Sequence, residues 1–138
     1  MNNKTYTTLE FDKILKLLAD MALSQNIKDQ ITSLQPYMRE MDVIKHLKQT
    51  TQGKAIIEKS GNPPIAALIN LNKALSLVEQ NAVLTAEDLG YVSQFIVTCR
   101  RMKTYLSKCS DVAEDISAYA GSIYALDTMQ NEIASSIR

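Results

Sequence analysis

The feature that most constrains this chain is a run of apolar residues between Leu89 and Leu106 at spacings of three and four. An α-helix has about 3.6 residues per turn, so this spacing places the residues on one helix face. The pattern Thr85-x-x-Asp88, just before the run, is typical of a helix start. We therefore predict a long amphipathic helix whose buried stripe is Leu89, Val92, Phe95, Ile96, Cys99, Met102 and Leu106.

Apolar residues recur at helical spacing along most of the chain, whereas glycine and proline are scarce. No strand-like alternation of useful length is present, so we predict an all-α fold, an irregular bundle of about six helices. The clearest break is Gly61-Asn62-Pro63-Pro64. We expect helices one to three in residues 1–60, a turn in residues 61–70, and helices four onward in residues 71–138.

Caps and breaks mark where the helices begin and end. A capping box at Thr7-x-x-Glu10 predicts a first helix that runs to about Leu23. Period alone does not decide between helix and strand for residues 65–69. A second helix is expected to start at Ser24 and stop at Pro36, and a third to run from about Glu40 to near Ser60. Further starts are expected at Asn70 and Asp111. A last helix should carry Leu126, Met129, Ile133 and Ile137.

Composition and charge narrow the class of protein. The chain has 138 residues and a 46% hydrophobic composition, which suits one globular domain with a core of its own. Fifteen basic and fifteen acidic residues cancel, which excludes a protein that coats nucleic acid or membrane through bulk charge. The chain shows neither a membrane-length apolar stretch nor a signal peptide, and it has only two cysteines. We expect a cytoplasmic protein with reduced thiols and no membrane association.

Residues that could carry catalysis or hold a metal are sparse. The only imidazole is His46, and Cys99 and Cys109 are too far apart for a metal pair, so we predict inert thiols and a solvated or interfacial histidine. Glu87-Asp88 and Glu114-Asp115 suit helix starts. No catalytic, cofactor-binding or metal-binding residue is predicted in this chain.

Gly53-Lys54-Ala55 is similar to the end of a phosphate-binding loop. However, Lys48 stands where that loop needs its first glycine, and Ala55 replaces the hydroxyl that would bind magnesium. The sequence therefore excludes a P-loop in these residues.

One charged segment is a candidate nucleic-acid contact. No acidic residue occurs between Leu89 and Ser110, and the second half of this segment carries four cations, of which Lys103 lies near the apolar side and would have to extend around it. The functional interpretation is a phosphate-contacting patch. The alternative, which the sequence favours, is that cations near a helix end complement its dipole. The candidate residues are Arg100, Arg101, Lys103 and Lys108.

Several motifs in register resemble the start of the type-two MutS family, the bacterial MutS paralogues with a C-terminal Smr domain. The resemblance extends from about Leu9 to Ile137, nearly the whole chain. Asn26-Ile27, Asn81 and Gly121-Ser122-Ile123-Tyr124 depart from the family pattern. The motifs are Thr8-Leu9-Glu10-Phe11-Asp12-Lys13-Ile14, Leu34-Gln35-Pro36, Gly61-Asn62-Pro63-Pro64, Leu71-x-x-Ala74-Leu75, Val83-Leu84-Thr85-x-Glu87-Asp88-Leu89, Arg101-Met102-Lys103-x-x-Leu106 and Leu126-x-x-Met129-x-x-x-Ile133.

The resemblance implies a non-catalytic N-terminal part of the helical core and lever region. Proteins of this family dimerise through an ABC-type ATPase and carry an Smr endonuclease. They are associated with recombination control on branched DNA and, in some bacteria, with rescue of collided ribosomes. The expected partners are the rest of the chain, a second copy, DNA and the ribosome. ATP and magnesium are expected only in the full-length parent, which we expect to continue beyond Arg138.

Two other functions stay open from the residues themselves. One is a free-standing helical interaction module whose groove accepts a partner helix. The other is an autonomous, weak nucleic-acid binder that uses the four cations. An apolar stripe on the last helix would be exposed in the isolated chain, so we also expect self-association at high concentration.

Overall fold

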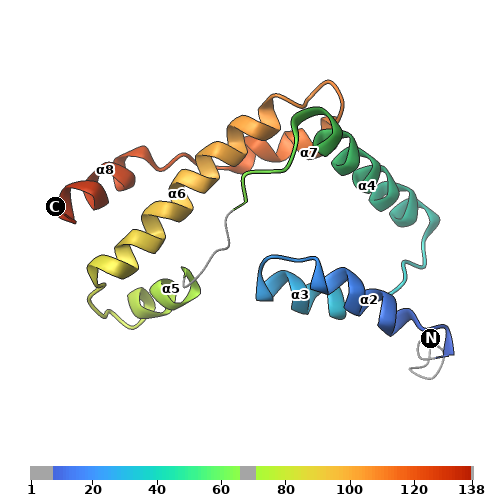
Figure 1. The fold of residues 1–138 in the computed structure, drawn as a ribbon, viewed down its shortest axis with the longest axis horizontal. Helices are drawn as coiled ribbons and strands as arrows, with labels where there is room; N and C mark the ends of the chain where they lie inside the picture. The colour runs from blue at the N-terminus through green and yellow to red at the C-terminus, as the bar shows by residue number, and fades with distance from the viewer. Residues whose placement is uncertain (1–7, 66–70, 138) are drawn as a thin grey trace. The chain divides into compact units, whose positions relative to one another are not determined.

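The computed structural model describes residues 8–65 and 71–137 (Figure 1). Within these ranges the chain forms seven α-helices and one 3-10 helix, with no β-strand, which confirms the predicted all-α fold. The chain divides into two compact units, Met1–Arg39 and Glu40–Arg138. The turn at Gly61–Pro64 lies inside the second unit, where helices from both sides of it pack together.

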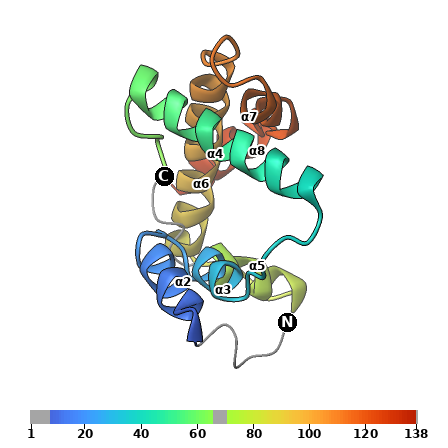
Figure 2. The same ribbon diagram turned by 90° about the vertical axis from the view of Figure 1, so that its right-hand side faces the viewer.

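The first unit is a helical pair, α2 (Phe11–Asp20) and α3 (Gln25–Thr32), which lie side by side (Figure 2). Leu15 and Ala19 are the buried residues of α2. The backbone of Ser24 is extended, and its Oγ accepts a hydrogen bond from the Ile27 N–H at 3.4 Å. This cap confirms the predicted start of the second helix.

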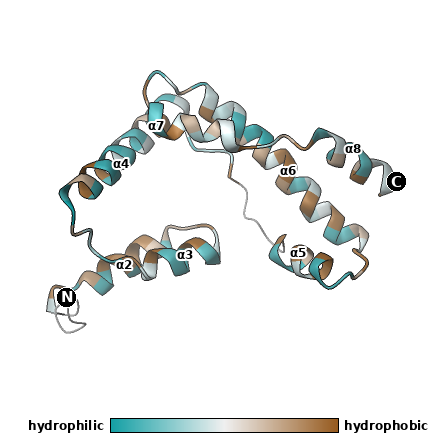
Figure 3. Cartoon of the chain, turned by 180° about the vertical axis from the view of Figure 1, so that it is seen from behind, coloured by the Kyte–Doolittle hydropathy of each residue, from teal (hydrophilic) through white to brown (hydrophobic). Residues whose placement is uncertain are grey.

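The second unit is built around α6 (Ala86–Ser107). Helix α5 (Leu71–Glu79), the 3-10 helix η1 (Ala118–Ser122) and α8 (Asp127–Ser136) all pack against α6, whereas α4 (Glu40–Ser60) packs against the short α7 (Glu114–Ser117). Hydrophobic and hydrophilic residues both occur along the whole length of α6 (Figure 3). Every residue of the predicted stripe from Leu89 to Leu106 is buried or half-buried.

A small hydrophobic core joins the C-terminal end of α6 to α4 and to the segment that follows α6. Cys109 is fully buried there, and Ile56 is 3% exposed. Met102, Tyr105, Ile116 and Ile123 pack around this core, which consists of Ile56, Leu106, Cys109, Ala113 and Ala120. The core therefore fixes the end of α6 that carries the predicted basic residues.

The first helix differs from its predicted bounds at both ends. Glu10 is the residue before α2, in the left-handed conformation (φ 57°), and its carboxylate binds Lys13 Nζ at 2.6 Å instead of capping an amide. The helix ends at Asp20 rather than near Leu23, because Ser24 already caps α3 and the residues between them form the connecting turn. Glu10 therefore precedes α2 instead of lying within its first turn, and the predicted Thr7–Glu10 capping box involves Thr7, which lies outside the described residues.

The predicted cap at Asp111 is also wrong. The residue before α7 is Ala113, which has no side chain able to cap, and the Asp111 carboxylate instead binds Lys59 Nζ, with Oδ2 at 2.6 Å. The Asp111 carboxylate therefore forms an ion pair with Lys59 of α4 instead of capping a helix. Asn70 and residues 66–69 lie outside the described residues.

Candidate nucleic-acid interface

A cleft of about 410 Å³ opens along the C-terminal half of α6 and the end of α4. Three of the four predicted cations line it, and no carboxylate does. The lining residues are Ser60, Arg100, Arg101, Thr104, Tyr105 and Lys108. The structure therefore brings Arg100, Arg101 and Lys108 together at one concave surface.

Helical spacing explains why these α6 residues share the cleft. Arg100, Thr104 and Lys108 follow one another at intervals of four, which places them on one face of the helix. Arg101 and Lys108 are seven residues apart, close to two full turns. The α6 wall of the cleft is thus a direct consequence of the sequence.

Long-range contacts supply the wall from α4. Tyr105 donates its hydroxyl to the Gly61 carbonyl oxygen at 2.6 Å, and Ser60 Oγ lies 3.2 Å from Cys109 Sγ. Lys59 Nζ holds Asp111 beside these contacts. Burial raises the pKa of Tyr105, which keeps its hydroxyl protonated as the donor in this bond.

Lys103 does not line this cleft. Its side chain extends around the half-buried flank of α6, and Nζ donates a hydrogen bond to the Ile123 carbonyl oxygen at 3.0 Å. This agrees with the prediction that its ammonium would have to extend past the apolar side. Of the four candidates, Lys103 is therefore the one whose ammonium group binds the segment after η1.

The other three cations differ in how far they are engaged. Arg100 forms an ion pair with Asp127, the first residue of α8, and its side chain stays 48% exposed. Arg101 and Lys108 are exposed, and within the described part of the chain neither side chain has an ion-pair partner. Their charges are consequently available to a ligand.

The observed end of α6 bears on the dipole interpretation. The helix ends at Ser107, so no basic residue lies in its last turn, and only Lys108 stands at the cap. Since the dipole effect falls off within the last turn, it does not account for Arg100 and Arg101. The dipole interpretation therefore applies to Lys108 alone.

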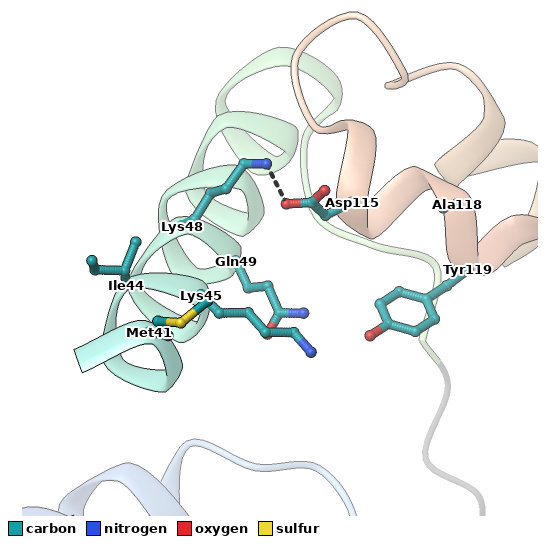
Figure 4. Close-up of a pocket in the computed structure, with 8 residues that line it drawn as sticks. All are labelled: Met41, Ile44, Lys45, Lys48, Gln49, Asp115, Ala118 and Tyr119. Carbon is teal, nitrogen blue, oxygen red and sulfur yellow. Dashed lines mark ion pairs between the residues drawn. The ribbon is translucent and has the colours of Figure 1, made fainter. Parts of the chain in front are cut away.

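A second concavity lies between the N-terminal half of α4 and the α7–η1 segment (Figure 4). The Lys48 ammonium binds Asp115 Oδ2 at 2.7 Å, and this contact raises the pKa of Lys48 and lowers the pKa of Asp115. Met41 and Ile44 stand exposed on its α4 side, and Tyr119 faces them from η1. This surface is mainly apolar, and Lys45 and Lys48 also line it.

Buried Gln52 connects α4 to α7 at the end of that concavity. Its Nε2 donates to Asp115 Oδ2 at 3.1 Å, and its Oε1 accepts from the Ile116 N–H at 3.2 Å. The Gln52 amide therefore provides an acceptor for a backbone N–H of α7, and it positions the Asp115 carboxylate beside Lys48.

The two thiols are buried or half-buried, as the sequence predicts. Cys109 is fully buried, with Sγ 3.3 Å from the Tyr105 carbonyl oxygen, and burial raises the pKa of half-buried Cys99. A raised pKa keeps a thiol protonated and unreactive. His46 is half-buried on α4.

In residues 8–65 and 71–137, no cluster of three or more His, Cys, Asp or Glu residues could hold a metal ion. None of the helices described there combines the length and the apolar character that a bilayer crossing requires.

Sequence reasoning missed three residues that line the cleft. Thr104 could have been found, since it lies midway between Arg100 and Lys108 at helical spacing. Tyr105 could also have been found, since it follows Arg101 at an interval of four. Ser60 enters through the folding of α4 onto the end of α6, for which the sequence offers no local signal.

Comparison with known proteins identifies relatives named "Endonuclease MutS2". The chain is 29% identical over 114 residues to "Endonuclease MutS2" of Clostridium perfringens strain 13, covering 83% of this chain and 14% of the relative. It is 27% identical to the protein of that name from Clostridium botulinum ATCC 19397, covering 99% of this chain and 18% of the relative. The Lacticaseibacillus casei BL23 protein of that name is 29% identical over 80% of this chain.

No protein-family model and no solved structure matches the chain. The chain spans less than one fifth of the length of the curated relatives that it matches. The chain is therefore a homologue of a segment that makes up 14–18% of these MutS2 proteins, which carry the name of the family that its motifs resemble.

Proposed function

We propose that this chain acts as a non-catalytic lever segment of a MutS2-like protein and relays ATP-driven motion to parts that contact nucleic acid. The observation that supports this is the bracing of α6 along its length. With 22 residues and a rise of about 1.5 Å per residue, α6 is a strut of about 33 Å.

Side-chain bonds join this strut to three other segments. Asp88 at its start lies 3.7 Å from Lys73 of α5, and Ser93 Oγ accepts a hydrogen bond from Gln130 Nε2 of α8 at 2.8 Å. Lys103, nearer its end, binds the Ile123 carbonyl after η1. A helix held at several points moves as one body, because displacing one end displaces every element bonded to it.

The relatives' name supplies the proposed context. They are called endonucleases, and the family resemblance adds an ATPase that uses ATP and magnesium, a homodimer, and action on branched DNA or collided ribosomes in the cytoplasm. In this proposal those activities belong to other parts of the full-length protein, and this segment couples them.

The test uses full-length Endonuclease MutS2 of Clostridium perfringens, with proline at the position aligned with Gln94, an exposed residue of α6. Proline inside a helix removes a hydrogen bond and kinks the axis, at a cost of about 3 kcal/mol or more. We expect basal ATP hydrolysis to persist and its stimulation by branched DNA to be lost.

Alanine at the same position is the matched control, and it should behave as the unmodified protein. Glycine provides a milder break of about 1 kcal/mol and keeps the test valid if the proline variant does not fold. Full DNA stimulation in both the proline and the glycine variants would contradict the lever role.

A second function, a helical interaction module, is favoured by the apolar concavity of Figure 4. Met41 is 82% exposed and Ile44 is 58% exposed, which is costly unless another apolar surface covers them. Sedimentation of the 138-residue chain at increasing concentration tests the self-association expected from such surfaces. Met41→Ser with Ile44→Ser should reduce it, whereas a monomer at every concentration would argue against this function.

A further inference from the structure

We propose that the cleft between the end of α4 and the C-terminal half of α6 binds the phosphodiester backbone of a polynucleotide strand directly. This goes beyond a lever that only relays motion, and it holds or fails independently of that role. The site consists of Arg100, Arg101 and Lys108, with the hydroxyls of Ser60 and Thr104 beside them.

The charge of the cleft is the first argument. The whole chain has a formal net charge of zero, yet this surface gathers three cations and no carboxylate among its lining residues. Asp127 and Asp111 are already engaged, Asp127 with Arg100 and Asp111 with Lys59. An anion entering the cleft therefore meets uncompensated positive charge at Arg101 and Lys108.

The spacing of the cations is the second argument, and it favours a strand over a single free phosphate. Arg101 and Lys108 are separated by seven residues, or about 10 Å along the helix axis. One strand of a duplex carries a charge about every 3.4 Å along its axis, so cations this far apart can meet different phosphates of one strand. A row of cations of this length is suited to successive phosphates.

The donor chemistry is the third argument. Arginine presents a planar fork of N–H donors that matches phosphate oxygens, and two of the three cations are arginines. Arg100 keeps donors free beyond its bond to Asp127, because a guanidinium has five N–H groups. The hydroxyls of Ser60 and Thr104 add short-range polar contacts of the kind that position a nucleic-acid backbone.

The experiment measures binding of the 138-residue chain to labelled oligonucleotides of about 20 nucleotides by fluorescence anisotropy. One sequence is used as single-stranded DNA, single-stranded RNA and duplex DNA, at salt between about 50 and 200 mM. The test variant is Arg101→Gln with Lys108→Gln. Both residues are exposed, so the fold should persist, and circular dichroism verifies it.

The matched control is Lys16→Gln with Lys54→Gln, which changes the net charge equally at two exposed lysines that do not line the cleft. We expect the test variant to lose at least tenfold in affinity at about 50 mM salt. Its slope of log affinity against log salt should be shallower by about two, since two phosphate contacts are removed. The control should keep affinity within about twofold.

A third variant tests the site by gain of function. Asp127→Asn releases Arg100 from its ion pair, so affinity should rise above that of the unmodified chain. Whether DNA or RNA binds more tightly identifies the source of the phosphates, and either preference supports the site. Absence of binding at low salt, equal losses in the test and control variants, or displacement by poly-glutamate as readily as by unlabelled oligonucleotide would overturn the proposal.

Discussion

The two ends of α6 are stabilised by different kinds of contact. At the N-terminal end, Thr85 Oγ1 accepts a hydrogen bond from the Asp88 N–H at 3.2 Å, and Asp88 Oδ2 accepts one from the Thr85 N–H at 3.0 Å. The partners are three residues apart, and the reciprocal bonds form a capping box. The N-terminal end of α6 is therefore capped by residues that are neighbours in the sequence.

The C-terminal end is closed by residues that are distant in the sequence. Leu106 and Cys109 pack with Ile56 of α4 and with Ala113 and Ala120, and Lys59 reaches Asp111. The cation-lined cleft lies at this end. The candidate site therefore depends on tertiary packing, whereas the start of the helix depends on local sequence.

The largest expected effect comes from Ile56→Ala, which removes most of a side chain that is 3% exposed. A large-to-small change of this type in a core costs about 2–5 kcal/mol. The free energy of unfolding, measured in urea, should fall by that amount, and oligonucleotide affinity should fall with it.

Ile57→Ala is the matched control for that prediction, because the Ile57 side chain, next in sequence to Ile56, is 49% exposed. This variant should lower the free energy of unfolding much less than Ile56→Ala does, and it should leave oligonucleotide affinity unchanged. If Ile56→Ala lowered stability but left the affinity of the folded protein intact, the cleft would not depend on this packing.

A smaller effect is expected from Thr85→Ala at the other end of α6. Loss of the cap leaves the Asp88 N–H without its acceptor and should cost about 1 kcal/mol. Hydrogen exchange should quicken at the first-turn amides only, and oligonucleotide affinity should stay unchanged. Thr50→Ala, at an exposed threonine of α4, serves as control, and faster exchange near Leu106 in the Thr85 variant would contradict the separation of the two ends.

The same division explains what the sequence could predict. Periodicity and the Thr85 cap predicted α6, its buried stripe and the position of Lys103, because each depends on neighbours within a few residues. Asp111 was mispredicted because its partner, Lys59, comes from another helix. The buried bridge of Gln52 and the contribution of Ser60 to the cleft had no local signal, since both arise when α4 folds onto later segments.

The smallest expected effect is a difference in how salt changes the pKa of three carboxyl groups. Hydrogen bonds from Thr85 are the main cause that lowers the pKa of Asp88, whereas the ammonium groups of Lys59 and Lys48 mainly lower those of Asp111 and Asp115. The folded state therefore prefers these groups ionised, so their stabilisation is complete above the ordinary value of 3.8. It is lost as the pH falls below that value through the lowered pKa of each group.

At about 1 M salt the screening length shrinks to about 3 Å, which weakens exposed ion pairs more than a hydrogen-bonded cap. We expect carboxyl-carbon NMR titrations in high salt to raise the pKa of Asp111 and Asp115 toward 3.8, with a smaller rise for Asp88, whose pairing with Lys73 is a minor cause. An equal rise for Asp88 and Asp111 would mean that both ends of α6 rely on ion pairing, and the contrast between a local cap and long-range contacts would then not extend to their electrostatics. Asp115, in α7, serves as a second ion-paired reference.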